Sequence, residues 1–359
     1  MAGSTIGSIF RVTTWGESHG AGVGAVVDGC PAGLKIDENY IQSFLDRRKP
    51  GQSKFTTQRF ESDTVRILSG VFEGTTLGTP ISLVIENKSQ ISKDYSNIAN
   101  VYRPGHADYG FDAKYGFRDY RGGGRSSGRE TAGRVAAGAV AIKILNEIGI
   151  DIHAYVTQIG DIKIDRSTFD LEESLRNPLC MPDAKAAEKA SEYLEKLMSE
   201  GDSSGAMVEC VITGVPAGVG EPVFDKLDAR LAQAIMSIGA VKGIEIGDGF
   251  SVVGSRGSEN NDEFYMDGDQ VAKKTNHSGG ILGGISDGSD IVLRAAFKPT
   301  PSIYRKQHTV NSSHEELDIE IQGRHDPIIA PRAVVVVEAM AAMTLYDLIL
   351  LQNVNKNSC

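Results

Sequence analysis

The sequence has 359 residues, of which 40% are apolar, 41 are glycine and 12 are proline, and its formal net charge is −10. This composition is typical of a globular protein with many tight turns, and it excludes a fibrous or disordered chain. The acidic balance argues against nonspecific binding to nucleic acid or to an anionic membrane, because both require a positive field.

Two similar segments of the chain predict a repeated strand-turn-helix unit. Residues 18–33 and 203–218 are identical at nine of sixteen aligned positions. Each segment has the pattern of a strand that ends in a Gly-x-Pro-Ala-Gly turn. An amphipathic helix is predicted after each turn, at 38–47 and at 224–235.

The repeat predicts two related halves, around residues 18–47 and 203–235, packed about a pseudo-twofold axis. The two copies differ at one informative position, where His19 of the first copy corresponds to Ser204 of the second. If both copies serve the fold, the fold does not require this histidine.

Further predicted elements mix strands with helices, which indicates an α/β or α+β sandwich. The predicted strands are at 23–27, 81–86, 207–213, 251–253 and 291–296. A helix at 182–199 lies within a polar excursion at 161–200, where we expect no catalysis.

The longest apolar run, at 333–351, contains Glu338 and Asp347. These carboxylates argue against a membrane span, so we predict a strand at 333–337 followed by a buried helix.

Two positive islands stand out against the acidic remainder of the chain. Residues 47–66 carry six basic and two acidic side chains, and residues 103–134 carry seven and four. The second island contains the run Arg-Gly-Gly-Gly-Arg-Ser-Ser-Gly-Arg at 121–129. Ser127 and Glu130 have the Ser-x-x-Glu spacing of a capping box, which predicts a helix that starts after Ser127. A helix N-terminus beside arginines favours an anion such as phosphate.

Among the seven histidines, the local sequence indicates which are candidates for proton transfer. His19 and His106 lie in glycine-flanked turns, from which a side chain can reach a cleft. His325, with Asp326, is a further candidate, because it brings a base and a carboxylate close to Arg324. The histidines at 153, 308 and 314 have no such setting and are expected on the surface or in packing roles. No histidine pair has the helical spacing of a zinc site, so no transition metal is predicted.

The cysteines Cys30, Cys180, Cys210 and Cys359 have neither the spacing of a zinc site nor the density of a disulfide scaffold. The start of the chain has no apolar stretch typical of a secretory signal. Both features favour a cytoplasmic location.

These motifs together resemble those of chorismate synthase. The resemblance rests on Gly-Glu-Ser-His-Gly at 16–20, Gly-Gly-Arg-Ser-Ser-Gly-Arg at 123–129 and Gly-Arg-His-Asp-Pro at 323–327, and it follows the family's order over nearly the whole chain. It implies a single domain over residues 1–359 with a β-α-β sandwich core, and a homotetramer. It also implies a lyase that converts 5-enolpyruvylshikimate 3-phosphate to chorismate and phosphate by 1,4-anti elimination.

The family requires reduced FMN, although its reaction involves no net oxidation. The extra segments of bifunctional fungal members are missing here, so the resemblance implies flavin reduced elsewhere, by an external NADPH-dependent or other source. The residues that would hold FMN by this resemblance are Arg125, Ser126, Ser127, Gly239, Ala240, Gly283, Lys298, Pro299, Thr300, Pro301, Ser302 and Arg324. The residues that would clamp the substrate anions are Arg48, Lys54, Arg134 and Arg332.

The resemblance also implies three catalytic roles. His19 would act as general acid on the departing phosphate, and His106 would protonate or orient the reduced flavin. Asp326 would help the flavin N5 region to accept the ring proton. Two alternatives from other classes stay open: a flavin- or phosphosugar-binding protein without catalysis, and an RNA-binding protein that uses the arginine-glycine run.

Overall fold

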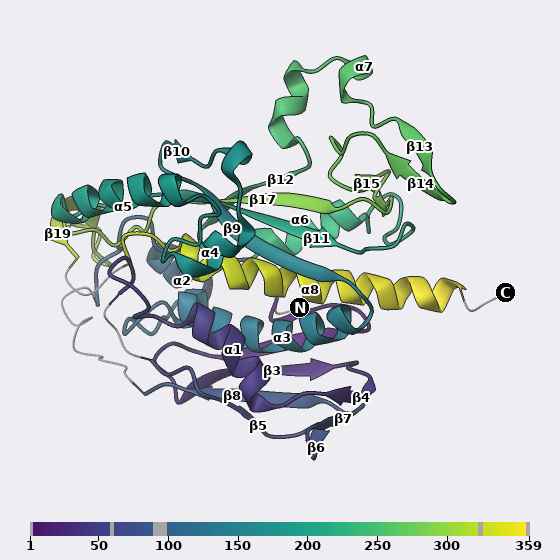
Figure 1. Ribbon diagram of the computed structural model, residues 1–359. Helices are drawn as coiled ribbons and strands as arrows, with labels where there is room; N and C mark the ends of the chain where they lie inside the picture. The colour runs from purple at the N-terminus through teal and green to yellow at the C-terminus, as the bar shows by residue number, and fades with distance from the viewer. Residues whose placement is uncertain (1–2, 58–60, 89–98, 322–325, 357–359) are drawn as a thin grey trace.

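The computed structural model describes residues 3–57, 61–88, 99–321 and 326–356. Two five-stranded antiparallel sheets enclose a layer of helices, as Figure 1 shows. The first sheet has the order β1 (Thr5–Ile6), β2 (Arg11–Gly16), β3 (Gly22–Asp28), β8 (Ile81–Glu86) and β5 (Val65–Ile67). The second has the order β10 (Ile162–Lys163), β9 (Asp151–Ile159), β11 (Ala206–Thr213), β17 (Ile291–Phe297) and β12 (Val241–Ile246).

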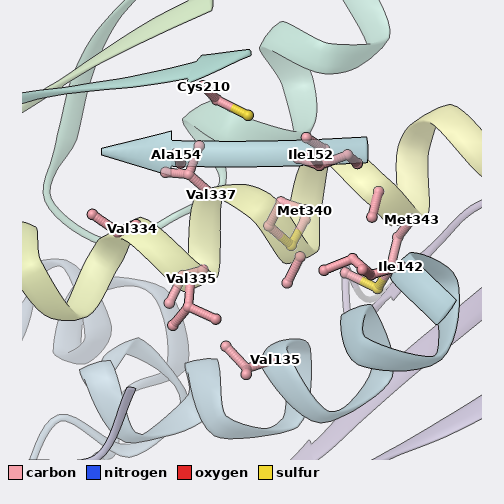
Figure 2. Close-up of a cluster of buried hydrophobic side chains, with 14 of the residues drawn as sticks. Val135, Ile142, Ile152, Ala154, Cys210, Val334, Val335, Val337, Met340 and Met343 are labelled. Carbon is pink, nitrogen blue, oxygen red and sulfur yellow. The ribbon is translucent and has the colours of Figure 1, made fainter. Parts of the chain in front are cut away.

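The helix layer contains α1 (Glu38–Arg48), α3 (Thr131–Glu147), α6 (Leu227–Met236) and α8 (Ala330–Lys356). α3 lies against β3 on one side and α8 on the other, and α8 in turn packs against β9 and β11. Both long helices are apolar around most of their circumference, as expected for helices buried between two layers. Figure 2 shows this interior, where Val135 and Ile142 of α3 face Val335 and Met340 of α8.

The remaining elements lie outside these three layers. Short sheets are formed by β4 (Ala32–Lys35), β7 (Thr75–Leu77) and β6 (Val71–Phe72), by β13 (Phe264–Asp267) and β14 (Gln270–Lys273), by β15 (Ile281–Leu282) and β16 (Ile285–Ser286), and by β18 (Lys306–Val310) and β19 (Glu316–Glu320). The other helices are α2 (Asp108–Tyr115), α4 (Leu171–Arg176), α5 (Ala184–Ser199) and α7 (Gly257–Asn260). The 3-10 turns are η2 (Gly124–Ser126), η3 (Gly128–Glu130), η4 (Arg166–Thr168) and η5 (Gly249–Gly254).

The mixed α+β architecture confirms the predicted fold class. The two similar sequence segments supply β3 and β11, each the central strand of its five-stranded sheet. Each of these strands is followed by a helix, α1 or α6, in the layer between the sheets. A twofold relation between the halves stays a prediction. The predicted excursion at 161–200 contains η4, α4 and α5, and α5 begins at a cap in which Asp183 accepts from two backbone N–H groups.

Two predicted strands are wrong. Residues 333–337 belong to α8, which begins at Ala330 and buries this valine run on all sides. A buried helix and a buried strand can share the same short apolar run, so packing decides between them. Residues 251–253 lie in η5, a short exposed turn between Gly249 and Gly254.

α8 is also long and apolar enough to span a bilayer by composition alone. Within the part of the chain that the structure describes, 89% of its most apolar window is buried inside the protein. This burial is what a core helix requires. Glu338 within it accepts two hydrogen bonds from Arg47 and one from the backbone N–H of Ala154, which joins α1, α8 and β9.

Candidate active site

A cleft of about 1060 Å³ opens where the first turns of α3 and α8 meet the loops after β2 and β17. Its volume lies just above the roughly 300–1,000 Å³ usual for one ligand, so a nucleotide-sized cofactor and a small substrate fit together. Nine lysines and arginines line it, against six carboxylates. The cleft is therefore net positive in a protein of net charge −10.

The start of α3 forms one wall of the cleft and differs in detail from the predicted capping box. The Ser127 side chain accepts from the backbone N–H of Arg129 at 3.2 Å, and the turn η3 precedes the α-helix, which begins at Thr131. Glu130 does not complete the box, because its carboxylate accepts from Thr14 Oγ1 at 2.7 Å and from Arg134 Nε at 2.8 Å. Glu130 therefore orients side chains of the cleft.

Each of the seven arginines that line the cleft lies within 4 Å of a carboxylate. Three of these carboxylates, Asp63, Asp108 and Glu130, are at most 6% exposed, and each contacts two arginines. The pairs are Arg48 and Arg129 with Asp63, Arg103 and Arg118 with Asp108, Arg125 and Arg134 with Glu130, and Arg332 with Asp326. These partners hold the guanidinium groups in place before any ligand binds.

Sequence reasoning missed the pairing of these three buried carboxylates with the arginines. Asp63 and Asp108 lie inside the two basic islands, where they counted only as negative charges, and Glu130 was assigned to a capping box. The arginine charges hold the pKa of Asp63 and of Asp108 below its usual value, against a burial effect in the opposite direction that is the largest single influence. Asp63 also has a backbone φ of 46°, an uncommon conformation for a residue other than glycine.

His19 lies on the loop after β2 and lines the cleft. Its Nδ1 lies 3.1 Å from Ser18 Oγ. Gly122 packs directly against the ring, because a Cβ atom at position 122 would lie 2.4 Å from Nδ1. The glycine run therefore leaves room for the imidazole ring of His19, which is present in the first copy of the repeat only.

His106 lies in the short loop before α2, on another wall. Its Nδ1 lies 3.0 Å from the carbonyl oxygen of Pro104, and its Nε2 lies 3.1 Å from Ser302 Oγ. Burial, followed by the charge of Arg103, lowers the pKa of His106 to about 4. The neutral ring must donate from Nδ1, since a carbonyl oxygen only accepts, so Nε2 accepts from Ser302. An anion bound beside this ring would favour its protonated form.

Asp326 is anchored at the start of the segment that leads into α8. Its carboxylate accepts from the backbone N–H of Thr57 at 2.5 Å and from Arg332 Nη1 at 2.6 Å. Arg332 also donates from Nε to the carbonyl oxygen of Arg48 at 3.0 Å. Arg48 donates in turn from Nη2 to the carbonyl oxygen of Gly128 at 2.7 Å, so one network connects Asp326 to both positive islands.

The cleft brings together most of the predicted site residues, from seven separate segments of the chain. Those that line it are His19, His106, Asp326, Arg48, Arg125, Ser126, Ser127, Arg134, Gly239, Ala240, Lys298, Thr300, Pro301, Ser302 and Arg332. Arg125 directs its guanidinium toward β2, where it donates to the carbonyl oxygens of Thr14 and Gly16.

Four predicted residues are not among these. Lys54 pairs with Glu195 of α5 and lies over the Phe55 ring, so it does not line the cleft. Gly283 lies between β15 and β16, and Pro299 lies between two lining residues without lining the cleft itself. Arg324 is outside the described residues, as is His325.

The fold and the cleft define an α+β enzyme that binds a polyanion beside two histidines and a carboxylate. The family model of chorismate synthase matches residues 10–350. A chorismate synthase of Lachnoclostridium phytofermentans is 65% identical over 98% of this chain and 96% of its own length. One of Paracoccus denitrificans is 55% identical, again over 98% and 96% of the two chains. A crystal structure of chorismate synthase superimposes with a TM-score of 0.78 at 34% identity, covering 96% of this chain and 93% of that one.

The chain belongs to the chorismate synthase family. It is a lyase that converts 5-enolpyruvylshikimate 3-phosphate to chorismate and phosphate, the last step of the shikimate pathway. The family uses a reduced flavin. A substrate with one phosphate and two carboxylates accounts for a cationic cleft in an acidic protein.

Proposed function

We propose that the cleft binds FMN, which reaches it already reduced by another protein or reagent, together with the substrate. The observation that carries this proposal is one cationic cleft large enough for both molecules. Thr300 Oγ1 supports the fit, because it is buried in the cleft wall and has no hydrogen-bond partner among the described residues. A buried hydroxyl without a partner is costly, so a bound ligand is its natural acceptor.

Several residues of this chain would hold the cofactor. They are Ser126 and Ser127 at the start of α3, the backbone at Gly239 and Ala240, and the loop from Lys298 to Ser302. When bound, the reduced flavin supplies the transient electron that weakens the C–O bond of the substrate.

The substrate anions would be held by Arg48, Arg134 and Arg332. Their carboxylate partners fix their orientation, which lowers the entropy lost when an anion binds. His19 would donate a proton to the departing phosphate oxygen, and a protonated phosphate is the better leaving group. His106 would accept a hydrogen bond at Nε2 and so orient the groups beside the reduced flavin. Asp326 would assist removal of the proton from the substrate ring.

The assignment is tested by anaerobic assay of chorismate and phosphate formed from 5-enolpyruvylshikimate 3-phosphate. We expect turnover with FMN reduced by dithionite and none with oxidised FMN, because the chain relies on flavin reduced elsewhere. Turnover with oxidised FMN and NADPH alone would show that the chain reduces its own flavin. Absence of product with reduced FMN, despite folded protein that retains flavin, would contradict the proposed use of the cleft.

We also propose a homotetramer in the cytoplasm. The segment from η5 to β14 projects from the body of the protein in Figure 1 and carries exposed apolar side chains. Phe250 is 76% exposed, Val253 88%, Phe264 58%, Met266 62% and Val271 65%. Such a patch is typical of a surface that contacts another protein chain.

Light scattering of the purified protein tests this assembly. We expect the mass of four chains, and a smaller mass when Phe250 and Val253 are both replaced by glutamate. A monomeric mass for the unsubstituted protein would refute the tetramer.

A further inference from the structure

The turn before β11 occupies the place in the second copy of the repeat that the His19 turn occupies in the first. Residues 203–205 precede β11 as residues 18–20 precede β3, and both have the sequence Ser-x-Gly. His19 lines the cleft, whereas the described residues that line it include neither Ser203 nor Ser204. The two equivalent turns therefore differ in what they contact.

Ser203 holds the loop that follows β17. Its Oγ donates to the carbonyl oxygen of Thr300 at 2.7 Å. Thr300 itself lines the cleft, where its buried Oγ1 has no hydrogen-bond partner among the described residues. A second contact lies further along the loop, where the backbone N–H of Tyr304 donates to the carbonyl oxygen of Gly201 at 2.9 Å. Residues outside the cleft thus fix this loop at two points.

Ser204 holds a different part of the cleft. Its backbone N–H donates to the carbonyl oxygen of Pro327 at 3.0 Å, and Pro327 directly follows Asp326. Ser204 is 4% exposed, so the larger imidazole of the first copy would have to displace its neighbours at this position. One buried turn therefore supports both the loop after β17 and the segment that carries the Asp326 carboxylate.

Support of this kind affects how well a site binds and reacts. A group that contacts a ligand must be held close to its productive position, and neighbouring hydrogen bonds provide that restraint. Thr300 has a restrained carbonyl oxygen and an unsatisfied hydroxyl in the same residue. The restraint on the first fixes where the second points.

We propose that Ser203 is a positioning residue of the active site. Its hydroxyl fixes the backbone of Thr300 and so directs Thr300 Oγ1 toward the bound flavin, while the adjacent Ser204 N–H fixes the segment of Asp326. The inference rests on the proposed function, since it concerns the loop assigned to FMN. The second copy of the repeat thereby serves the same cleft as the first, through hydrogen bonds to the backbone in place of a histidine.

Titration of the full-length protein with oxidised FMN tests the role of Ser203. We expect Ser203→Ala to weaken FMN binding by about 3- to 10-fold, the range that one hydrogen bond between neutral groups contributes. Ser203→Thr keeps the hydroxyl and should restore the affinity to within about twofold. In a Thr300→Val background, Ser203→Ala should change the affinity by less than about twofold, because Ser203 acts through Thr300.

Ser69→Ala is the matched control. The Ser69 hydroxyl also donates to a carbonyl oxygen of another segment, that of Pro80 at 2.8 Å, and Ser69 is not among the described residues that line the cleft. Thermal unfolding should show a similar loss of stability in the Ser69 and Ser203 variants. Only Ser203→Ala should weaken FMN binding, so a general loss of stability is separated from positioning.

Hydrogen exchange of residues 298–305 provides a second readout that needs no ligand. We expect Ser203→Ala to speed exchange of the Tyr304 amide severalfold, because the loop opens more easily once the contact at Thr300 is lost. Ser69→Ala should leave this exchange unchanged.

Unchanged FMN affinity in Ser203→Ala would overturn the positioning role, even with faster exchange in the loop. An equal loss of FMN affinity in Ser69→Ala would overturn it as well, because the effect would then come from stability alone. If the unsubstituted protein binds no FMN, the proposed function fails. The exchange rate then still decides whether Ser203 holds the loop, and an unchanged rate would refute that contact.

Discussion

Replacement of His19 by alanine is expected to lower the kcat for chorismate formation by about 100-fold or more, while the fold stays intact. The departing phosphate leaves as an oxyanion, and loss of a positioned general acid removes the proton that stabilises it. The fold does not depend on this side chain, because the second copy of the repeat has Ser204 at the same position. The ring lies against Gly122 in the cleft wall, which fixes its position in the cleft.

The measurement is single-turnover formation of chorismate with dithionite-reduced FMN. His153→Ala is the matched control, since this histidine is exposed on β9 outside the cleft and its loss should leave the rate unchanged. Flavin and substrate affinities of the His19 variant should stay close to those of the unsubstituted protein. A rate within about threefold of the unsubstituted enzyme would remove His19 from proton transfer.

Gly138→Val is expected to lower the free energy of unfolding by about 3 kcal/mol or more. Gly138 lies where α3 crosses α8, and a Cβ atom there would lie 2.2 Å from Ala339 Cβ and 2.5 Å from Ala339 Cα. The second contact is with backbone, so no side-chain rotation relieves it. The two helices must separate, and the interior between the sheets then loses its close packing.

Chemical denaturation measures this loss. The control is Gly110→Ala in α2, another helical glycine, where a Cβ atom would meet nothing within 4 Å. That substitution should raise the free energy of unfolding by a few tenths of a kcal/mol to about 1 kcal/mol, because alanine is the better helix residue. Equal stability of the Gly138 variant and the unsubstituted protein would show that α3 and α8 do not meet this closely.

The pairing of every cleft arginine with a carboxylate has a chemical consequence. Buried guanidinium groups without partners would repel one another and destabilise the fold. The Asp63 carboxylate offsets part of the charge of Arg48 and Arg129, and Glu130 does the same for Arg134 and Arg125. Each of these carboxylates balances one charge of its two arginines, so the arginines are fixed in orientation while the cleft keeps the net positive charge that attracts anions.

Local chemistry in the sequence determined the elements and the kind of site. Hydrophobic alternation and turn residues predicted the strands that became β3, β8, β11 and β17, and helical periodicity predicted α5. The excess of arginine around 121–129 predicted an anion site at a helix start, where Ser127 does accept a backbone hydrogen bond. These features depend on residues close together in the chain, so the sequence alone reveals them.

Tertiary structure alone decided which residues meet. The valine run at 333–337 is helical because α8 is enclosed by α3 and the second sheet, and its composition suits a strand equally well. Lys54 faces Glu195, and Asp63 faces two arginines, through contacts between segments distant in sequence. The bulge at Lys242 arises from the register of β12 on β17. Such contacts depend on packing and strand register, which no local pattern encodes.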